Sequence, residues 1–306
     1  MSVLEIASVS RWFGNVVAVN DVTMTIGPGV TGLLGPNGAG KSTLISMMAG
    51  FLPPSSGTVT LDGEPTWRNE DIYRLIGLVS EREGMYDGLS GWQFVQANAR
   101  LHRLADPDGA ARRAITTVDM DDARDRELGT YSKGMKQRIK MAAALVHDPT
   151  VLLLDEPFNG MDPRQRLHLM DLLRATAAAG RTVLFSSHIL EEVKVVASHI
   201  EVVVSGRHAA SGDFRRIRRL MTDRPHQYVL RSSDDRRLAA AIIADQSATS
   251  VELDPLQQVL MVQATDFERF ITLLPRVARS AGVRLLEVRP SDESLESVFS
   301  YLVSSR

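Results

Sequence analysis

The pattern of hydrophobic and polar positions divides the chain into two parts of different character. Over about the first two thirds, short apolar runs rich in β-branched residues alternate with longer stretches that are apolar at helical spacing, which predicts an α/β fold. The predicted strands of this part are Leu4–Val9, Val16–Ile26, Val30–Leu34, Gly57–Gly63, Ile76–Ser80, Val151–Leu154, Thr182–His188, and Ile200–Val204 with Arg207–Ala209. The predicted helices are Thr43–Gly50, Gly91–Leu104, Gly109–Val118, a helix opened by Tyr131–Arg138, Pro163–Ala179 and Ile189–Ala197.

Turn and cap residues mark the joints between these elements. Gly14-Asn15 predicts a turn that joins the first two strands as an antiparallel pair. Ala105–Asp108 contains a proline and predicts the break between two successive helices. Ser132 is a good N-cap for the helix that follows it.

The composition shifts near Gly212, which predicts a domain boundary. Asp213–Arg219 is rich in arginine, and Thr222–Pro225 has the composition of a linker. The elements predicted beyond it are strand Gln227–Arg231, helix Arg236–Ala244, strands Ser250–Leu253 and Val259–Gln263, helix Phe267–Ala281, strand Arg284–Val288 and helix Leu295–Val303. This is the split β-α-β-β-α-β order of ferredoxin-like domains, with one helix added. We therefore divide the chain into residues 1–212, a linker over 213–225, and a small α+β domain over 226–306 without a catalytic constellation.

The composition is that of an ordinary soluble globular protein. The 306 residues suffice for about two domains, and 44% of them are hydrophobic. A net charge of −2 offers no bulk attraction to nucleic acid or anionic lipid, so we expect no nucleic-acid partner. The absence of cysteine excludes disulfides, cysteine nucleophiles and thiolate metal sites. No signal segment opens the chain and no apolar run approaches the ~18 residues of a membrane helix, which predicts a cytoplasmic protein.

The most specific motif is the run Gly35-Pro36-Asn37-Gly38-Ala39-Gly40-Lys41-Ser42-Thr43, which fits the phosphate-loop pattern G-x-x-x-x-G-K-[ST]. Its glycines lack a Cβ, so the backbone can adopt positive φ and lie close to an anion. Backbone N–H groups and the N-terminus of the following helix favour phosphate there. Lys41 supplies a full positive charge, Ser42 is a candidate Mg²⁺ ligand, and Thr43 can hold the α-phosphate. The alternative is a glycine turn before an ordinary helix.

Polar side chains also follow two other predicted strands at their carboxyl ends. Asp155 and Glu156 follow the strand that starts at Val151, and His188 follows Ser186-Ser187. In open α/β sheets, ligands bind at this edge. Taken singly, Asp-Glu-Pro is also compatible with a helix start, and a lone histidine is more often structural than catalytic. Phe13, at the first turn, is equally compatible with a core residue and with a flat platform for an adenine ring.

Together these motifs resemble the ATP-binding subunit of an ABC transporter over about residues 2–212. In the order of that family, Gly35–Thr43 corresponds to Walker A, Tyr131–Met135 to the signature, Val151–Glu156 to Walker B and His188 to the switch histidine. The segment Gly160-Met161-Asp162 resembles the D-loop. The resemblance implies a P-loop cassette with an antiparallel β subdomain and a helical subdomain. It also implies two subunits that meet head to tail around two ATP molecules.

The resemblance assigns a role to each matching residue. It implies that Asp155 holds Mg²⁺, that Glu156 polarises the attacking water, and that His188 contacts the γ-phosphate. It also favours Phe13 as the residue that stacks on adenine. Ser132 and Gly134 are expected to present a hydroxyl and backbone N–H groups to the γ-phosphate bound by the partner subunit.

Two departures from the family pattern mark a branch. Glu81 stands where the family usually has glutamine, and a carboxylate there can also ligate Mg²⁺. The signature Leu-Ser-Gly-Gly-Gln appears as Tyr-Ser-Lys-Gly-Met, so Met135 cannot make the hydrogen bonds of the glutamine. This variant and the ending Ser291–Phe299 resemble bacterial exporters that include the daunorubicin-resistance ATPases.

The branch resemblance implies an ATPase that powers a separate multi-span permease from the inner face of the membrane. The cargo would be drug-like, lipid or another small molecule, and the ATPase subunit would act as a dimer, most simply a homodimer. We expect the permease to contact the loop Arg82–Gly88 and the start of the helix that follows it, and the alternative is a solvated polar loop. Leu295, Val298, Phe299 and Leu302 form an apolar stripe that either packs on its own domain or strengthens the dimer.

Two other classes of protein carry a cassette of this kind. One is a soluble ABC protein that acts on ribosomes or DNA. Such proteins typically carry two cassettes in one chain, a coiled coil or a zinc insert, none of which is found here. The other is a nucleotide-binding regulator that does not hydrolyse ATP, and the presence of Glu156 and His188 argues against it.

Overall fold

The computed structural model describes residues 2–81, 84–213, 226–254 and 259–290. The chain divides into two compact units, Met1–Phe214 and Arg215–Arg306. Each unit has a hydrophobic core of its own.

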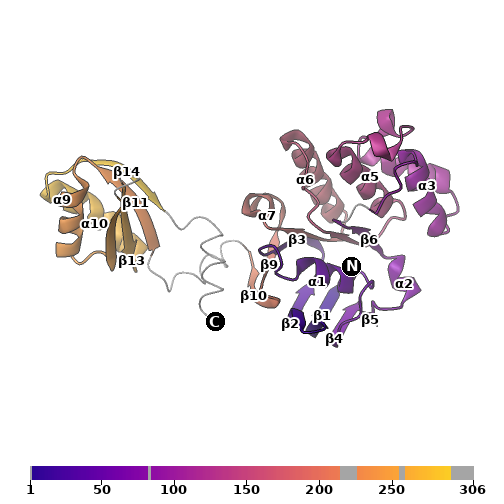
Figure 1. The fold of residues 1–306 in the computed structure, drawn as a ribbon, viewed down its shortest axis with the longest axis horizontal. Coiled ribbons are helices and arrows are strands. Elements are labelled where there is room, and N and C mark those ends of the chain that lie inside the picture. The colour runs from indigo at the N-terminus through magenta and orange to yellow at the C-terminus, as the bar shows by residue number, and fades with distance from the viewer. Residues whose placement is uncertain (1, 82–83, 214–225, 255–258, 291–306) are drawn as a thin grey trace. The chain divides into compact units, whose positions relative to one another are not determined.

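A six-stranded sheet forms the centre of the first unit (Figure 1). In spatial order it consists of β10 (Arg207–Gly212), β9 (His199–Val204), β3 (Gly29–Leu34), β8 (Thr182–Ser187), β7 (Val151–Leu154) and β6 (Ile76–Val79). Neighbours from β9 to β6 are parallel, and β10 pairs antiparallel with β9. Strands β7 and β8 are buried along their whole length, as expected for strands that are covered on both faces. The parallel order brings the carboxyl ends of β3, β8, β7 and β6 to one edge of the sheet.

A second, antiparallel sheet packs on the first through one helix. Its strands in spatial order are β2 (Val16–Ile26), β1 (Leu4–Phe13), β4 (Ser56–Leu61) and β5 (Glu64–Pro65). The predicted antiparallel pairing of β1 with β2 is confirmed. Helix α1 (Lys41–Met48) lies between the sheets, because its buried residues share one core with residues of β1, β3, β7 and β8 (Figure 1).

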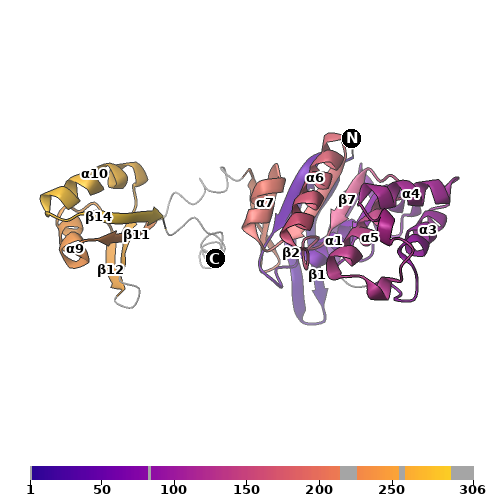
Figure 2. The same ribbon diagram turned by 90° about the horizontal axis from the view of Figure 1, so that it is seen from above.

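Helices cover the rest of the central sheet. Three of them, α3 (Gly91–Leu101), α4 (Pro107–Thr117) and α5 (Lys133–Leu145), gather at one end of the unit (Figure 2). Helices α6 (Pro163–Ala178) and α7 (Leu190–Val196) pack on β3 and β8. Shorter pieces are α2 (Glu70–Tyr73) and two 3-10 turns, Asp121–Ala123 and Leu128–Thr130. The prediction of a cassette with an antiparallel β subdomain and a helical subdomain is confirmed.

Two helix starts differ from the prediction by two residues. The segment Ala105–Asp108 was expected to be a break, but α4 begins inside it at Pro107. Asp106 caps the helix by accepting a hydrogen bond from Gly109 N, and proline suits the first helical position because an N–H there has no intrahelical partner. Helix α1 begins at Lys41, two residues earlier than expected. Lys41 therefore lies in the first turn of the helix, next to the glycine loop.

The second unit has the predicted ferredoxin-like order. Its sheet runs β12 (Ser250–Asp254), β13 (Val259–Ala264), β11 (His226–Ser232) and β14 (Leu285–Pro290), with α9 (Asp235–Ala244) and α10 (Phe267–Ser280) between strands in sequence. Neighbouring strands are antiparallel, and the two helices cover one face of the sheet. The predicted helix Leu295–Val303 lies outside the described residues. Within the described ranges, no helix has the length and apolarity needed to cross a membrane.

Candidate functional site

The glycine loop between β3 and α1 packs closely against neighbouring backbone. A Cβ built on Gly35 would lie 2.2 Å from Val203 O, and one built on Gly40 would lie 2.5 Å from Ala18 O. Gly38 and Gly40 have φ of +79° and +99°, a region that favours glycine, whereas Gly35 is required for close approach and not for positive φ. Asn37 and Ala39 complete the loop, and Ala39 N donates to Pro36 O. The loop thus has the compact form that a phosphate cradle needs.

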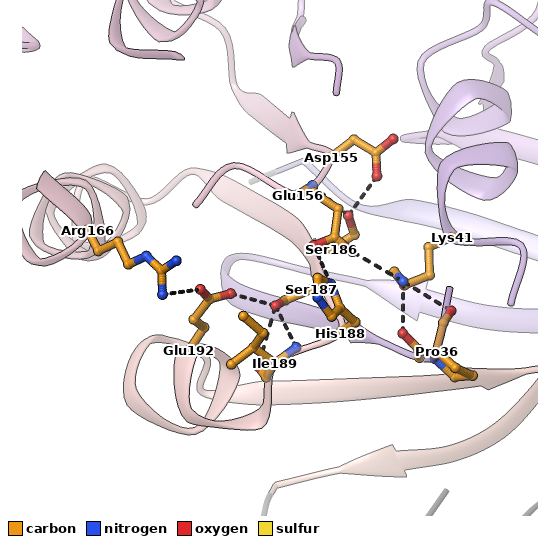
Figure 3. A network of polar contacts seen from close by, with 11 residues as sticks. Pro36, Lys41, Asp155, Glu156, Arg166, Ser186, Ser187, His188, Ile189 and Glu192 are labelled. Carbon is orange, nitrogen blue, oxygen red and sulfur yellow. Dashed lines mark hydrogen bonds and ion pairs between the residues drawn. The ribbon is translucent and has the colours of Figure 1, made fainter. Parts of the chain in front are cut away.

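Lys41 is buried at the centre of a polar network (Figure 3). Its Nζ donates hydrogen bonds to Gly35 O at 2.8 Å and to Pro36 O at 3.2 Å. The same Nζ lies 3.2 Å from Glu156 Oε1, which is an ion pair and not an aligned hydrogen bond. A buried ammonium attracts an anion strongly because water screens its charge little, and in this structure the Glu156 carboxylate is that anion.

Glu156 connects the Lys41 network to the end of β8. Its Oε2 lies 2.9 Å from His188 Nδ1, and since a carboxylate only accepts, the proton of this hydrogen bond belongs to the imidazole. The backbone of Glu156 has φ of +47°, a conformation that costs an ordinary residue about 1–3 kcal/mol. Glu156 is only 8% exposed, whereas His188 lies at the surface. Strained and buried carboxylates of this kind are concentrated at functional sites.

Asp155 is held by a residue that the sequence reasoning missed. Ser186 Oγ donates to Asp155 Oδ1 at 2.7 Å and accepts from Glu156 N at 2.8 Å. The hydroxyl therefore fixes both carboxylate residues at once, from the neighbouring strand β8. A serine pair that ends the apolar run of β8 was the signal available in the sequence.

The remaining members of the predicted magnesium set are oxygen donors on the surface. Ser42 is exposed in the first turn of α1, and Glu81 is exposed just after β6, at the same sheet edge. Among the described residues no group of three or more His, Cys, Asp or Glu side chains could hold a metal. Hydroxyl and carboxylate oxygens nevertheless suit Mg²⁺, which commonly takes one or two carboxylates and completes its shell with phosphates and water. The residues present fit Mg²⁺ bound together with a nucleotide.

The signature residues lie at the start of α5. Ser132 is the N-cap, as predicted, and its Oγ accepts from Met135 N at 3.2 Å. A Cβ on Gly134 would lie 1.9 Å from Gln165 Oε1 of α6, so this glycine permits a close helix contact. The contacts of both residues thus belong to α5 and α6 and not to the Lys41 network.

Phe13 is not a core residue. It lies at the end of β1 opposite Val16, and 48% of its surface is exposed. The guanidinium of Arg11 lies over the ring, 4.7 Å from its centroid. An exposed ring on a rigid hairpin is suited to stack on a flat ligand.

A cavity of about 660 Å³ opens beside the Glu81 loop. Apolar groups such as Met85, Phe94 and Leu101 line it together with the cationic side chains of Arg74, Arg103 and Lys140. His102 and His147 also line it, and their rings stack with centroids 3.7 Å apart. This cavity lies between α2, α3, α5 and β6.

The fold and this site define a P-loop ATPase of the cassette type. The ABC transporter family matches residues 19–159. An uncharacterised ABC transporter ATP-binding protein of Nostoc sp. is 37% identical over 204 residues, which are 64% of this chain and 60% of that protein. Among solved structures, an ATP-binding subunit of an ABC transporter is 25% identical, has a TM-score of 0.65, and covers 71% of this chain and 92% of its own.

Two other relatives extend the match to nearly the whole chain. A daunorubicin resistance ATP-binding protein of Streptomyces coeruleorubidus is 31% identical over 95% of this chain and 92% of its own length. The bacitracin transport ATP-binding protein of Enterococcus faecalis is 30% identical over 98% of this chain and 96% of its own. The chain belongs to the ATP-binding proteins of ABC transporters, which are ATPases that dimerise and work with a membrane permease.

Proposed function

We propose that the chain is the ATP-hydrolysing subunit of an exporter whose membrane domain is a separate permease. The observation that carries this proposal is the cluster at the carboxyl edge of the sheet, where the buried pair Lys41 and Glu156 meets the exposed His188. A mere nucleotide-binding regulator has no need of a strained carboxylate beside that lysine. The names of the relatives, which concern daunorubicin and bacitracin, support a drug-like or lipid-like small molecule as cargo.

The cluster supports a mechanism in which charge and positioning do most of the work. When ATP binds, its β- and γ-phosphates would compete with Glu156 for Lys41 and release the Glu156 carboxylate. Glu156 would then accept a hydrogen bond from the water that attacks the γ-phosphorus. His188 would contact the γ-phosphate through its ring, and the bond to the β-γ bridging oxygen would break with ADP as the leaving group.

The other predicted residues complete the nucleotide site in this proposal. Mg²⁺ would neutralise charge on the phosphates, held by Ser42 and Asp155 with Glu81 as a further oxygen donor. Phe13 would stack on adenine. Ser132 and Gly134 would face the γ-phosphate held by a second copy of the subunit, so two sites form only in a head-to-tail dimer. The subunit would then act at the inner face of the membrane, through its permease.

Replacing Glu156 tests the catalytic assignment most directly. Glu156→Gln keeps the shape and removes the charge, so we expect ATP to bind while turnover falls by at least about 100-fold. An ATP-bound dimer should accumulate, visible by size-exclusion chromatography with MgATP. The control is Asp171→Asn, an exposed carboxylate of α6, which should leave turnover unchanged. Turnover near the wild-type rate in Glu156→Gln would remove Glu156 from the catalytic role.

We further propose that the permease docks at the cavity beside the Glu81 loop. Of the predicted contact loop Arg82–Gly88, residues 82 and 83 lie outside the described residues. Met85 lines the cavity, and Tyr86 is 78% exposed, as expected for groups that a partner covers. We expect Met85→Ala with Tyr86→Ala to reduce transport strongly while basal ATPase activity stays within about two-fold, since neither residue contacts the Lys41 cluster. Transport at the wild-type rate in the double variant would place the docking surface elsewhere.

A further inference from the structure

A second polar chain lies beside His188 and joins three elements of the first unit (Figure 3). It runs from Arg166 of α6 through Glu192 of α7 to Ser187, the last residue of β8. Ser186 of the same strand donates its hydrogen bond to Asp155, so the two serines have different partners.

Ser187 fixes the turn that carries His188. Its Oγ accepts a hydrogen bond from Ile189 N at 3.0 Å, a local turn that spans His188. The same Oγ donates to Glu192 Oε2 at 2.6 Å. The Ser187 carbonyl oxygen accepts from Gly35 N at 3.4 Å. This one residue therefore ties the His188 turn to the phosphate loop on one side and to α7 on the other.

Glu192 is an unusual residue for the position it holds. It is only 4% exposed, although a glutamate on a short surface helix is ordinarily solvated. Burial raises the pKa of its carboxyl, whereas the hydrogen bond from Ser187 and the charge of Arg166 act in the opposite direction. Arg166 Nη1 lies 3.4 Å from Glu192 Oε1. A buried ion pair that serves only packing could be replaced at little cost if both partners became apolar.

We propose that Glu192, held by Arg166, is a positioning residue for His188. The inference rests on the proposed ATPase site and adds to it a pair of residues that lie outside it. Glu192 fixes the Ser187 hydroxyl, the hydroxyl fixes Ile189 N, and the imidazole between them is held 2.9 Å from Glu156 Oε2. Because a misplacement of about 1 Å can cost about 100-fold in rate, a loosened turn lowers the rate of hydrolysis without removing any group that touches ATP.

The experiment measures kcat and the Kd for ATP separately on the full chain with MgATP. The test variants are Glu192→Ala, Glu192→Gln and Arg166→Met. Arg174→Met is the matched control, because Arg174 also lies on α6 and donates to Val195 O next to the end of α7, at 2.7 Å. Arg174→Met thus removes a different hydrogen bond between α6 and α7 and leaves the contacts of Ser187 and Glu192 unchanged. Each variant is also tested in a His188→Ala background by single-turnover hydrolysis of radiolabelled ATP.

We expect Glu192→Ala to lower kcat about 10- to 100-fold while the Kd for ATP changes by less than about three-fold. Glu192→Gln can still accept the Ser187 hydroxyl, so it should recover part of the rate, and Arg166→Met should lose about as much as Glu192→Gln. Arg174→Met should stay within about two-fold of the wild type. In the His188→Ala background, Glu192→Ala should cause no further loss, because it acts only through the imidazole.

Three results would overturn the proposal. They are a loss in Arg174→Met equal to that in Glu192→Ala, a fully additive loss in the His188→Ala background, and wild-type turnover in all three test variants. If Glu192→Ala does not fold, the isosteric Glu192→Gln and the change Arg166→Met at a half-buried position test the same prediction. A His188→Ala variant that hydrolyses ATP at the wild-type rate would instead refute the proposed site, which keeps the two failures distinguishable.

Discussion

At the residue scale, a histidine pair in the cavity gives the protein a defined response to acid. His147 stacks on His102 with ring planes 4° apart, and its Nε2 lies 3.1 Å from Ile76 O. Burial lowers the pKa of His147 to about 4, with a further contribution from the charge of His102. The pKa of His102 is lowered as well, mainly by burial. Both rings are therefore neutral in the folded protein at neutral pH.

The pH dependence follows from the lowered pKa of His147. Between pH values of about 6.5 and about 4 the unfolded chain binds a proton at residue 147 that the folded chain does not bind. Unfolding is therefore favoured as the pH falls through this window, and the stability is fully present above it. The variant His147→Phe keeps the ring stack but cannot bind a proton at this position. We expect its melting temperature to fall less between pH 7.5 and pH 5 than that of the wild type. The effect is about 1 kcal/mol, because the ring is only partly buried. An equal fall in melting temperature for the two proteins over this pH range would contradict the prediction.

The role of a residue could be predicted from the sequence where the residue belongs to a local motif. It could not be predicted where the role depends on contact with a distant segment of the chain. Lys41 and Glu156 were identified from their own local patterns, and the structure brings them together. Ser186 had a weak signal, as a polar residue within an apolar strand. Glu192 had no such signal, because two successive glutamates in a helix usually indicate a solvated face. Only the fold shows that Arg166 of α6 pairs with it. Ion pairs between segments that lie far apart in the sequence require the fold.

At the element scale, the start of α5 can pack closely against α6 because Gly134 has no side chain. Gly134 leaves room for Gln165 Oε1, which a Cβ would approach to 1.9 Å. A substitution at Gly134 thus has two possible effects, one inside the chain and one on the partner's phosphate. The flexible end of Gln165 can move, so the clash inside the chain is removable.

A pair of variants separates the two effects. We expect Gly134→Ala to reduce turnover about 10-fold or more, because a methyl group would stand where the partner's γ-phosphate is proposed to bind. Adding Gln165→Ala removes the clash inside the chain, and in our proposal it leaves the defect in place. Gln165→Ala alone is the control and should be nearly neutral. Recovery of the wild-type ATPase rate in the double variant would show that Gly134 serves helix packing only.

The start of α5 could be predicted from its cap residue, whereas the start of α4 could not. Ser132 was recognised as an N-cap because serine followed by a helical pattern is a local signal. The start of α4 was misplaced because Pro107 was interpreted as a breaker, whereas it occupies the first helical position behind the cap Asp106. Proline can either end a helix or occupy its first position, and the aspartate before it was the signal that favours the second.

At the scale of the whole molecule, the chain behaves as two folding units. The first core joins both sheets through α1, and the second is built from β11, β13, α9 and α10 with Tyr228 and Phe270 in ring contact at 4.8 Å. The split strand order of the second unit was predictable because each strand and helix has its own periodicity. Its role was not, because a ferredoxin-like fold serves many functions and the sequence of this part shows no catalytic constellation. We propose that it is an accessory or regulatory domain.

Truncation tests this division of labour. A chain that ends at Thr222 retains every described residue of the nucleotide site, so we expect its Kd for ATP to stay within about three-fold of the full chain. It should also unfold in one cooperative transition, because residues 2–213 contain a complete core. If the second unit strengthens the dimer or its coupling to the permease, transport falls while ATP binding persists. A folded truncated protein without ATP affinity would contradict the two-domain division, and full transport would show that the second unit is dispensable.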